Sequence, residues 1–262
     1  TLIKNFVITS PALLDLSNFS STPVACFGES TGSVSITPAG GTAPYNYSWN
    51  TNPAQTTATA SNLTAGTYTI TVTDAGGSSA QQIVTVSQPL SALTVVANGT
   101  NILCAGAATG SATASVSGGT GAVTFSWTTV PAQTTASATG LVSGTYSVTT
   151  TDANGCTAVQ TATLTEPASA LSATVSQNNP SGFGLPNGSA SAVASGGVAP
   201  YTFAWSPTGG TGATASGLAA GTHTCTITDA NGCTQLIIVT LTQPNALVSG
   251  VSSVTHVACF GG

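Results

Sequence analysis

Residues 143–156 read SGTYSVTTTDANGC. Tyr146, Val148 and Thr150 alternate with small polar residues, which is typical of a β-strand with one buried face. The Asp-Ala-Asn-Gly sequence that follows favours a tight turn, because Asp caps backbone amides and Gly or Asn accepts a positive φ. The same pattern recurs at residues 65–78 (AGTYTITVTDAGGS) and 220–233 (AGTHTCTITDANGC). The chain is therefore built from a repeated strand–turn unit.

The pattern recurs at a nearly constant interval. Trp49, Trp127 and Trp205 are 78 residues apart (127 − 49 = 78; 205 − 127 = 78). Solenoid proteins repeat every ~20–50 residues, so this longer interval indicates tandem domains that each close their own core. We expect β-sandwich repeats at residues 12–89 (repeat 1), 90–167 (repeat 2) and 168–244 (repeat 3). An array of near-copies points to length, reach or multivalency, not to one active site.

Both ends of the sequence carry parts of a repeat. Residues 1–11 align with residues 79–89, the last strand of repeat 1, and residues 245–262 resemble the opening of a repeat, because HVACFGG matches PVACFGE around Cys26. We expect residues 1–11 to be the last strand of a preceding repeat and residues 245–262 the start of a following one. An alternative is strand donation, in which these partial strands complete a neighbouring molecule.

Each repeat is predicted to be a small β-sandwich. Short alternating strands with turn signals about every ten residues give the fold class: all-β, tandem immunoglobulin-like β-sandwich domains in an elongated array. The mid-repeat tryptophans resemble the core Trp of that fold, and we expect them to be buried against Ile70, Val148 and Cys225. Tyr68 and Tyr146 resemble its tyrosine corner, and in repeat 3 a ring nitrogen of His223 could replace the phenol as donor.

The composition excludes several classes of partner. Only 3% of the residues are charged, with one Lys, no Arg, six acids and a net charge of −5. Binding to nucleic acid or to anionic lipid needs Lys and Arg, so neither is expected. No apolar run approaches the ~18 residues of a membrane span, and we expect no direct membrane insertion.

No catalytic, metal or cofactor site is predicted. Asp74, Asp152 and Asp229 each lie alone in the Asp-Ala turn of a repeat, where capping of the turn is a better explanation than calcium, which prefers clustered carboxylates. His223 and His256 have no Cys or acid companion in sequence, and no nucleophile motif appears. We therefore predict a protein that is not an enzyme and needs no cofactor.

A glycine-rich loop precedes the third strand of each repeat. These Gly-Gly loops read GGTAPY (residues 40–45), GGTGAV (118–123) and GGVAPY (196–201). Their glycines predict turns rather than phosphate cradles. Tyr45 and Tyr201 could present exposed rings for glycan contact, since aromatic faces suit sugars. The favoured interpretation is that these rings pack against the core or within the loop itself.

The repeated motifs resemble those of the SprB repeat family. The pattern is C-x-G-x-x-x-G-S, G-G-x-x-P-Y-x-x-x-W, L-x-x-G-T-Y, D-A-N-G-C and a Pro-ended strand, and repeat 1 begins it with Cys26, Gly28, Gly32 and Ser33. The resemblance covers essentially the whole chain. It implies a very large surface protein of gliding Bacteroidota, secreted by the type IX route and acting as a mobile adhesin. The chain departs from the pattern at Ser78 and Gly182, which replace cysteines, at His223, which replaces Tyr, and at Ala122, which replaces Pro.

The cysteines allow two pairing schemes. Cys26, Cys104 and Cys259 follow the first strand of a repeat, whereas Cys156 and Cys233 begin the last strand. Pairing inside one repeat gives only Cys104–Cys156. Pairing successive repeats gives Cys26–Cys156 and Cys104–Cys233 and leaves Cys259 for a further repeat. It also explains why repeat 1 can have Ser78, and repeat 3 Gly182, in place of one of its two turn cysteines. We predict the second scheme, with the first as its rival, and we expect Cys225 to be a buried free thiol.

These expectations combine into a functional hypothesis. The chain would be a non-enzymatic segment of a secreted, extracellular, cell-surface repeat protein, an adhesin or filament stalk that projects a binding tip. Its partners would be neighbouring repeats, identical chains in a filament, and surface polysaccharide or substratum bound by other regions. Because charge repulsion is weak, we also expect side-by-side association or shielding by glycans. The alternatives are a carbohydrate-binding repeat array and an accessory region of a larger secreted enzyme.

Overall fold

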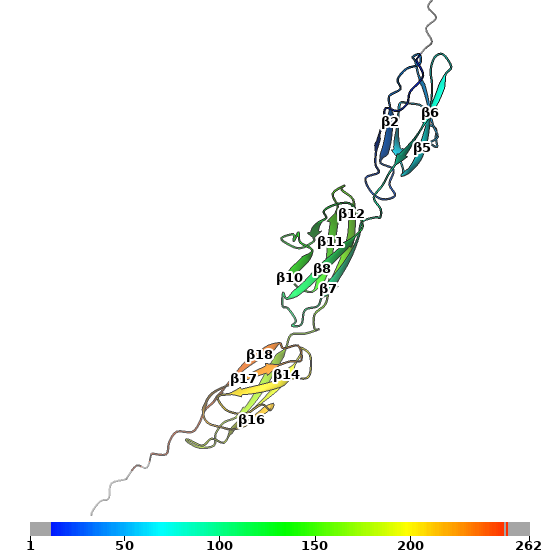
Figure 1. The fold of residues 1–262 in the computed structure, drawn as a ribbon. Coiled ribbons are helices and arrows are strands. Elements are labelled where there is room, and N and C mark those ends of the chain that lie inside the picture. The colour runs from blue at the N-terminus through cyan, green and yellow to red at the C-terminus, as the bar shows by residue number, and fades with distance from the viewer. Residues whose placement is uncertain (1–11, 249, 251–262) are drawn as a thin grey trace, which may run out of the picture. The chain divides into compact units, whose positions relative to one another are not determined.

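The computed structural model describes residues 12–248 and residue 250 (Figure 1). Six strands form each repeat. In repeat 1 they are β1 (Phe19–Thr22), β2 (Gly32–Ile36), β3 (Asn46–Trp49), β4 (Thr59–Leu63), β5 (Gly66–Thr73) and β6 (Ser79–Val86). In repeat 2 they are β7 (Thr94–Thr100), β8 (Gly110–Ser117), β9 (Thr124–Trp127), β10 (Ser137–Leu141), β11 (Gly144–Thr151) and β12 (Thr157–Leu164). In repeat 3 they are β13 (Ser172–Asn178), β14 (Gly188–Ser195), β15 (Thr202–Ser206), β16 (Thr214–Leu218), β17 (Gly221–Thr228) and β18 (Thr234–Leu241).

Each repeat is an immunoglobulin-like sandwich of two three-stranded sheets (Figure 1). One sheet contains the first, second and fourth strands, and the other contains the third, fifth and sixth, as in β1-β2-β4 and β3-β5-β6. Neighbouring strands such as β5 and β6 pair antiparallel. The predicted all-β sandwich class is therefore confirmed.

The described chain divides into two compact units. One extends to Gly99 and adds Ala112–Thr139 and Thr145–Thr163, and the other comprises Thr100–Ser111, Gly140–Gly144 and the residues from Leu164 on. The division thus passes through repeat 2 rather than between repeats. The first unit contains the disulfide-bonded Cys26 and Cys156, and the second contains the bonded Cys104 and Cys233, so each bond lies inside one unit.

The core of each sandwich is centred on its tryptophan. Trp49 and Trp127 are 1% exposed and Trp205 is 7% exposed. Each pairs across the sheet with the residue predicted from the sequence: Trp49 with Ile70, Trp127 with Val148, and Trp205 with Cys225. The indole Nε1–H donates to a backbone carbonyl, that of Thr57, Thr135 or Gly212. The ring of each Trp is thus buried in the core, and its N–H group still has a hydrogen-bond acceptor.

The predicted corner residue is the third residue of the fifth strand in each repeat. The hydroxyl of Tyr68 donates to the carbonyl of Thr64 at 3.0 Å. In repeat 3, His223 Nε2 lies 2.9 Å from the carbonyl of Ala219, and since a carbonyl only accepts, Nε2 carries the proton. Among the residues that the structure describes, His223 Nδ1 then has no hydrogen-bond partner, although it is buried. Tyr146 occupies the same position in repeat 2 and is half-buried.

Candidate functional site

Two kinds of turn carry the disulfide-bonded cysteines. The first turn of a repeat connects its first and second strands (residues 23–31, 101–109 and 179–187). The last turn connects its fifth and sixth strands (residues 74–78, 152–156 and 229–233). The four disulfide-bonded cysteines lie in these turns, so the turns form the candidate site.

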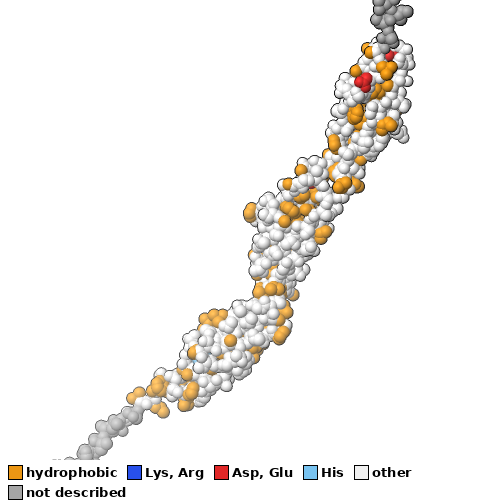
Figure 2. Space-filling view, in the orientation of Figure 1, with side chains coloured by type: hydrophobic (Ala, Val, Ile, Leu, Met, Phe, Trp, Pro, Cys, Tyr) orange, Lys and Arg blue, Asp and Glu red, His pale blue; other side chains and the backbone are white. Residues whose placement is uncertain are grey.

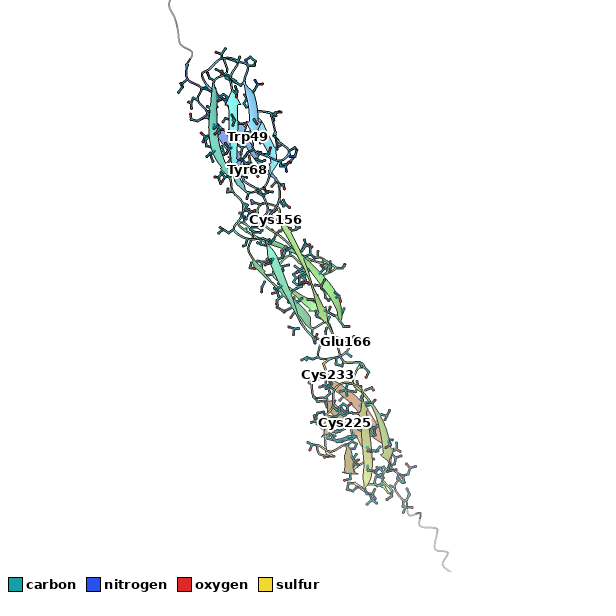
Figure 3. The ribbon with its side chains drawn as sticks, turned by 90° about the vertical axis from the view of Figure 1, so that its right-hand side faces the viewer. Trp49, Tyr68, Cys156, Glu166, Cys225 and Cys233 are labelled. Atoms are coloured by element: carbon teal, nitrogen blue, oxygen red, sulfur yellow. A yellow bond between two sulfur atoms is a disulfide. The ribbon has the colours of Figure 1, made fainter. Side chains whose placement is uncertain are left out.

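The first turn of repeat 1 is bonded to the last turn of repeat 2. Cys26 and Cys156 form a disulfide with an S–S distance of 2.04 Å and a Cα–Cα distance of 5.6 Å. Beside it, the Asn154 side-chain amide donates to the carbonyl of Ala25 at 2.9 Å. A covalent bond and an adjacent amide hydrogen bond therefore hold the two turns together. Figure 3 labels Cys156, the member of this pair in repeat 2.

The first turn of repeat 2 meets the last turn of repeat 3 in the same way. Cys104 and Cys233 form the second disulfide, with a Cα–Cα distance of 5.7 Å, and the Asn231 amide donates to the carbonyl of Leu103 at 2.8 Å. Both bonds join the pairs expected from the sequence, and Cys104 is not bonded to Cys156. Cys259 and His256 lie outside the described residues.

An aspartate shapes the last turn of each repeat. One carboxylate oxygen of Asp152 accepts the N–H groups of Asn154 and Cys156, both at 2.9 Å. The other oxygen accepts the N–H of Thr120 in the Gly-Gly loop at 2.8 Å. The sequence predicted the bonds within the turn but not the bond to the Gly-Gly loop. This carboxylate therefore fixes the turn that carries Cys156 to the body of its own repeat.

Asp74 and Asp229 make the corresponding bonds. Asp74 accepts from Ser78 and Thr42, and Asp229 accepts from Asn231, Cys233 and Val198. Burial raises the pKa of the Asp152 and Asp229 carboxyls, but the backbone N–H donors together outweigh it, and the pKa of each lies below its ordinary value. All three aspartates are structural acceptors, as expected for turn caps.

A Gln or Glu that precedes the final Pro of each repeat holds the first turn. The backbone N–H of Gly106 donates to Glu166, which also accepts the hydroxyl of Ser143 at 2.8 Å. These bonds lower the pKa of the Glu166 carboxyl, the backbone donor having the larger effect. The side chains of Gln88 and Gln243 accept from the N–H groups of Gly28 and Gly184 in the same way.

The role of these Gln and Glu side chains was missed from the sequence. Their partner glycines adopt positive φ values of 81°, 78° and 72° at Gly28, Gly106 and Gly184. A residue with a side chain rarely takes this conformation. In it, the N–H of each glycine donates to the side-chain oxygen of the Gln or Glu. The signal that could have revealed the contact is the coincidence of Q-P or E-P at the end of each repeat with C-x-G or G-x-G in its first turn.

Tyr45 and Tyr201 do not stand out from the surface as free rings. The hydroxyl of Tyr45 donates to the carbonyl of Gly40 at 2.6 Å, and that of Tyr201 donates to Gly196 at 2.7 Å. Both rings are half-buried and pack against the core of their repeat. Packing against the core and within the loop, which the sequence favoured, describes both residues, because the phenol satisfies a carbonyl of its own Gly-Gly loop. Contact with glycans stays a prediction.

The remaining candidate groups have structural surroundings. Cys225 is a buried free cysteine, as predicted, and burial raises the pKa of its thiol. Among the described residues, His, Cys, Asp and Glu side chains nowhere gather in a group of three that could hold a metal ion. In the same part of the chain, no helix is long and apolar enough to cross a membrane.

Comparison with solved structures finds arrays of immunoglobulin domains and an adhesin. The N-terminal eight Ig domains of DSCAM match with 11% identity and a TM-score of 0.35 over 91% of this chain, which spans 37% of that longer chain. A 1.5-MDa bacterial ice-binding adhesin matches with 18% identity and a TM-score of 0.42, over 88% of this chain and 97% of that one. The extracellular domains 3–5 of Drosophila OTK match with 13% identity and a TM-score of 0.30, over 90% and 99%.

Comparison with curated proteins by sequence gives no match. The family model of the SprB repeat matches the chain three times, at residues 18–54, 96–132 and 174–212. Each match begins at or close to the first strand of a repeat and extends past its tryptophan. The spacing of the three matches follows the spacing of the three sandwiches. The chain therefore belongs to the SprB repeat family and carries three of its repeats.

Proposed function

We propose that this chain is a stalk segment of a secreted cell-surface adhesin or filament, in which the repeats transmit tension to a binding region elsewhere in the protein. One observation carries the proposal: each disulfide joins two successive repeats instead of closing one repeat on itself. A bond within a repeat would stabilise that repeat alone. A bond between repeats restrains the joint between them, which is what a stalk under load requires.

The interlocked pairing limits how far the chain can be pulled out. When both disulfides are reduced, 207 residues separate Cys26 from Cys233 (233 − 26 = 207). When both are formed, the shortest covalent path passes from Cys26 to Cys156, back to Cys104 and across to Cys233. That path contains only 52 residues of backbone (156 − 104 = 52). The disulfides therefore remove most of the extensible length of the array.

The chemistry of the surface supports a structural and extracellular role. Disulfides persist in oxidising compartments outside the cytosol. The turn carboxylates Asp74, Asp152 and Asp229 are buried and occupied by backbone donors, which suits a cap rather than a catalyst. The face drawn in Figure 2 shows almost no charged side chains. Membership of the SprB repeat family supports the same interpretation.

Single-molecule force spectroscopy tests this proposal. The chain is held by its two ends and extended until all three repeats unfold, first oxidised and then in the presence of a reductant. At ~3.3–3.6 Å per extended residue, the 155 residues released by reduction (207 − 52 = 155) should lengthen the fully extended chain by about 500–550 Å. The Cys26→Ser/Cys104→Ser chain should behave like the reduced chain under both conditions. Equal extended lengths with and without reductant would contradict a stalk whose repeats are joined by disulfides.

Identical chains are a second class of partner in this proposal. Aliphatic side chains on the outer face of the last strands are exposed, among them Ile83, Val159 and Ile238. With 3% charged residues there is little repulsion to keep such faces apart. We expect side-by-side association that strengthens with protein concentration. Sedimentation velocity that finds only monomers at high concentration and physiological salt would count against it.

A further inference from the structure

The last turn of repeat 1 has the same backbone geometry as the bonded last turns but lacks both groups that reach another repeat. Asp74 accepts the N–H groups of Ser78 at 2.8 Å and Thr42 at 2.9 Å, and the Asp74 N–H donates to the Ser78 carbonyl at 2.9 Å. Ser78 stands where repeat 2 has Cys156, and Gly76 stands where it has Asn154. This turn therefore has neither the cysteine nor the amide that join the other repeats.

The first turn of repeat 3 shows the complementary loss. The N–H of Leu185 donates to the carbonyl of Gly182 at 3.3 Å, as Glu29 does to Cys26 and Ala107 does to Cys104 at 3.1 and 3.0 Å. The Gly184 N–H donates to Gln243 at 2.8 Å, like its counterparts in the other repeats. The turn is therefore built to the same plan, with Gly182 in place of the cysteine.

Apolar side chains surround this first turn. Phe183 is 61% exposed and Leu185 is 47% exposed, and with Pro244 and Leu247 they line an open cleft of about 490 Å³. At the disulfide junction of repeats 1 and 2, the corresponding Phe27 and Pro89 line a cleft whose other wall is provided by repeat 2, including Leu93. The last-turn end of repeat 1 also exposes an apolar side chain, since Leu13 is 92% exposed.

We propose that the first-turn face of repeat 3 (Ser181–Leu185 with Pro244 and Leu247) docks without a covalent bond on the last-turn face of repeat 1 (Leu13 and Asp74–Ser78) in a second copy of this three-repeat unit. The two faces match because neither carries a thiol, so that their contact leaves no cysteine unpaired. The two bonded junctions supply the template, since the same turns meet there. Each three-repeat copy then contains two disulfide-bonded junctions and is followed by one junction without a disulfide. The array bends at that junction, and under load the repeats separate there first.

A tandem chain tests this contact without depending on the proposed stalk function. Residue 244 of one copy is followed directly by residue 12 of a second copy, so that Leu14 of the second copy stands three residues after Pro244 in place of Leu247. Cys259 of the second copy is replaced by Ser. The first copy carries Gly182→Cys and the second carries Ser78→Cys. Both substitutions introduce the residue that the equivalent turns already hold. Gly182 is not at a positive φ, and a Cβ there meets only the flexible end of Leu185, at 2.9 Å.

The measurement is the glutathione redox ratio at which the disulfide introduced between positions 182 and 78, the junction bond, is half reduced. The matched control places the first cysteine at Ala219, which is exposed and follows Leu218, the partner of Gly188 at the end of the first turn of repeat 3. The chain that links the two copies and the cysteine at position 78 are the same in both proteins. If the faces dock, the junction bond should resist reduction at least about tenfold better than the control bond, a difference of about 1.4 kcal/mol. Equal ratios would overturn the proposal.

A second variant restores the missing amide. Gly76→Asn in the second copy supplies the side chain that would donate to the carbonyl of Ser181, and a Cβ at Gly76 makes only ordinary contacts, the nearest being an Asp74 carboxylate oxygen at 3.4 Å. We expect this substitution to raise the resistance of the junction bond further and to leave the control bond unchanged. An identical effect on both bonds would show that the two faces do not meet as the bonded turns do.

Discussion

The last turns of repeats 1 and 2 differ in a way that separates folding from assembly. Both begin with an aspartate that binds the turn and the Gly-Gly loop of its own repeat. Only the turn of repeat 2 carries Asn154 and Cys156, whose partners Ala25 and Cys26 belong to repeat 1. The contacts that close a sandwich are present in both turns. The contacts that join sandwiches can be removed without altering the turn.

The largest effect on stability is expected from removing a disulfide between two repeats. Replacing both Cys26 and Cys156 by Ser opens a loop of 130 residues, which in the chain-entropy account lowers the free energy of unfolding by about 4–5 kcal/mol. Ser78→Ala in repeat 1 is the matched control and should change it by less than about 0.5 kcal/mol. Denaturant unfolding followed by circular dichroism measures both. A similar loss in the two variants would erase the distinction between the turns.

Truncating the core tryptophan should destabilise each of the three repeats by a similar amount. Trp49→Ala, Trp127→Ala and Trp205→Ala each create a cavity beside the fifth strand, and each should lower the free energy of unfolding of its repeat by about 3–5 kcal/mol. Hydrogen exchange resolved by repeat would locate the loss. If one of the three substitutions were silent, the equivalence of the three cores would fail.

A smaller effect is expected from converting one turn into the other. Asn154→Gly gives repeat 2 the turn residue of repeat 1 and removes the bond to the Ala25 carbonyl, which should lower the free energy of unfolding by about 0.5–1.5 kcal/mol. The reverse substitution, Gly76→Asn, should leave the stability of the isolated chain unchanged. Thermal unfolding of the two variants decides the matter, and a gain from Gly76→Asn would contradict this assignment of the amide.

The smallest effect concerns pH. Hydrogen bonds from Gly106 and Ser143 lower the pKa of Glu166 below its ordinary 4.5. A carboxyl with a lowered folded-state pKa stabilises the protein above its unfolded pKa, and this stability is lost as the pH falls through the folded value. Glu166→Gln should therefore reduce the acid sensitivity of the melting temperature, and Gln88→Glu should increase it. Melting curves between about pH 2.5 and 7 check both directions, since Asp152 and Asp229 titrate equally in all the variants.

Much of the fold could be predicted because the repeat itself carries the information. The 78-residue interval, the alternating strands and the D-A-N-G turns predicted the sandwiches and the Trp-centred cores. The cysteine positions also favoured the pairs Cys26–Cys156 and Cys104–Cys233, because only pairing between successive repeats left no turn cysteine of the three repeats alone. The alternation along each strand and the number of cysteines in each repeat can be read directly from the sequence.

The sequence by itself determined which residues alternate into a core, where the turns fall and which turns lack a thiol. Only the tertiary structure decided that Asp152 also binds Thr120, that Glu166 holds Gly106, that Asn154 reaches Ala25 and that Tyr45 bonds its own loop. Side-chain polarity predicts that such groups need partners, but most of the partners lie tens of residues or more away along the chain. Their choice depends on which backbone N–H or carbonyl the folded chain brings within about 3 Å.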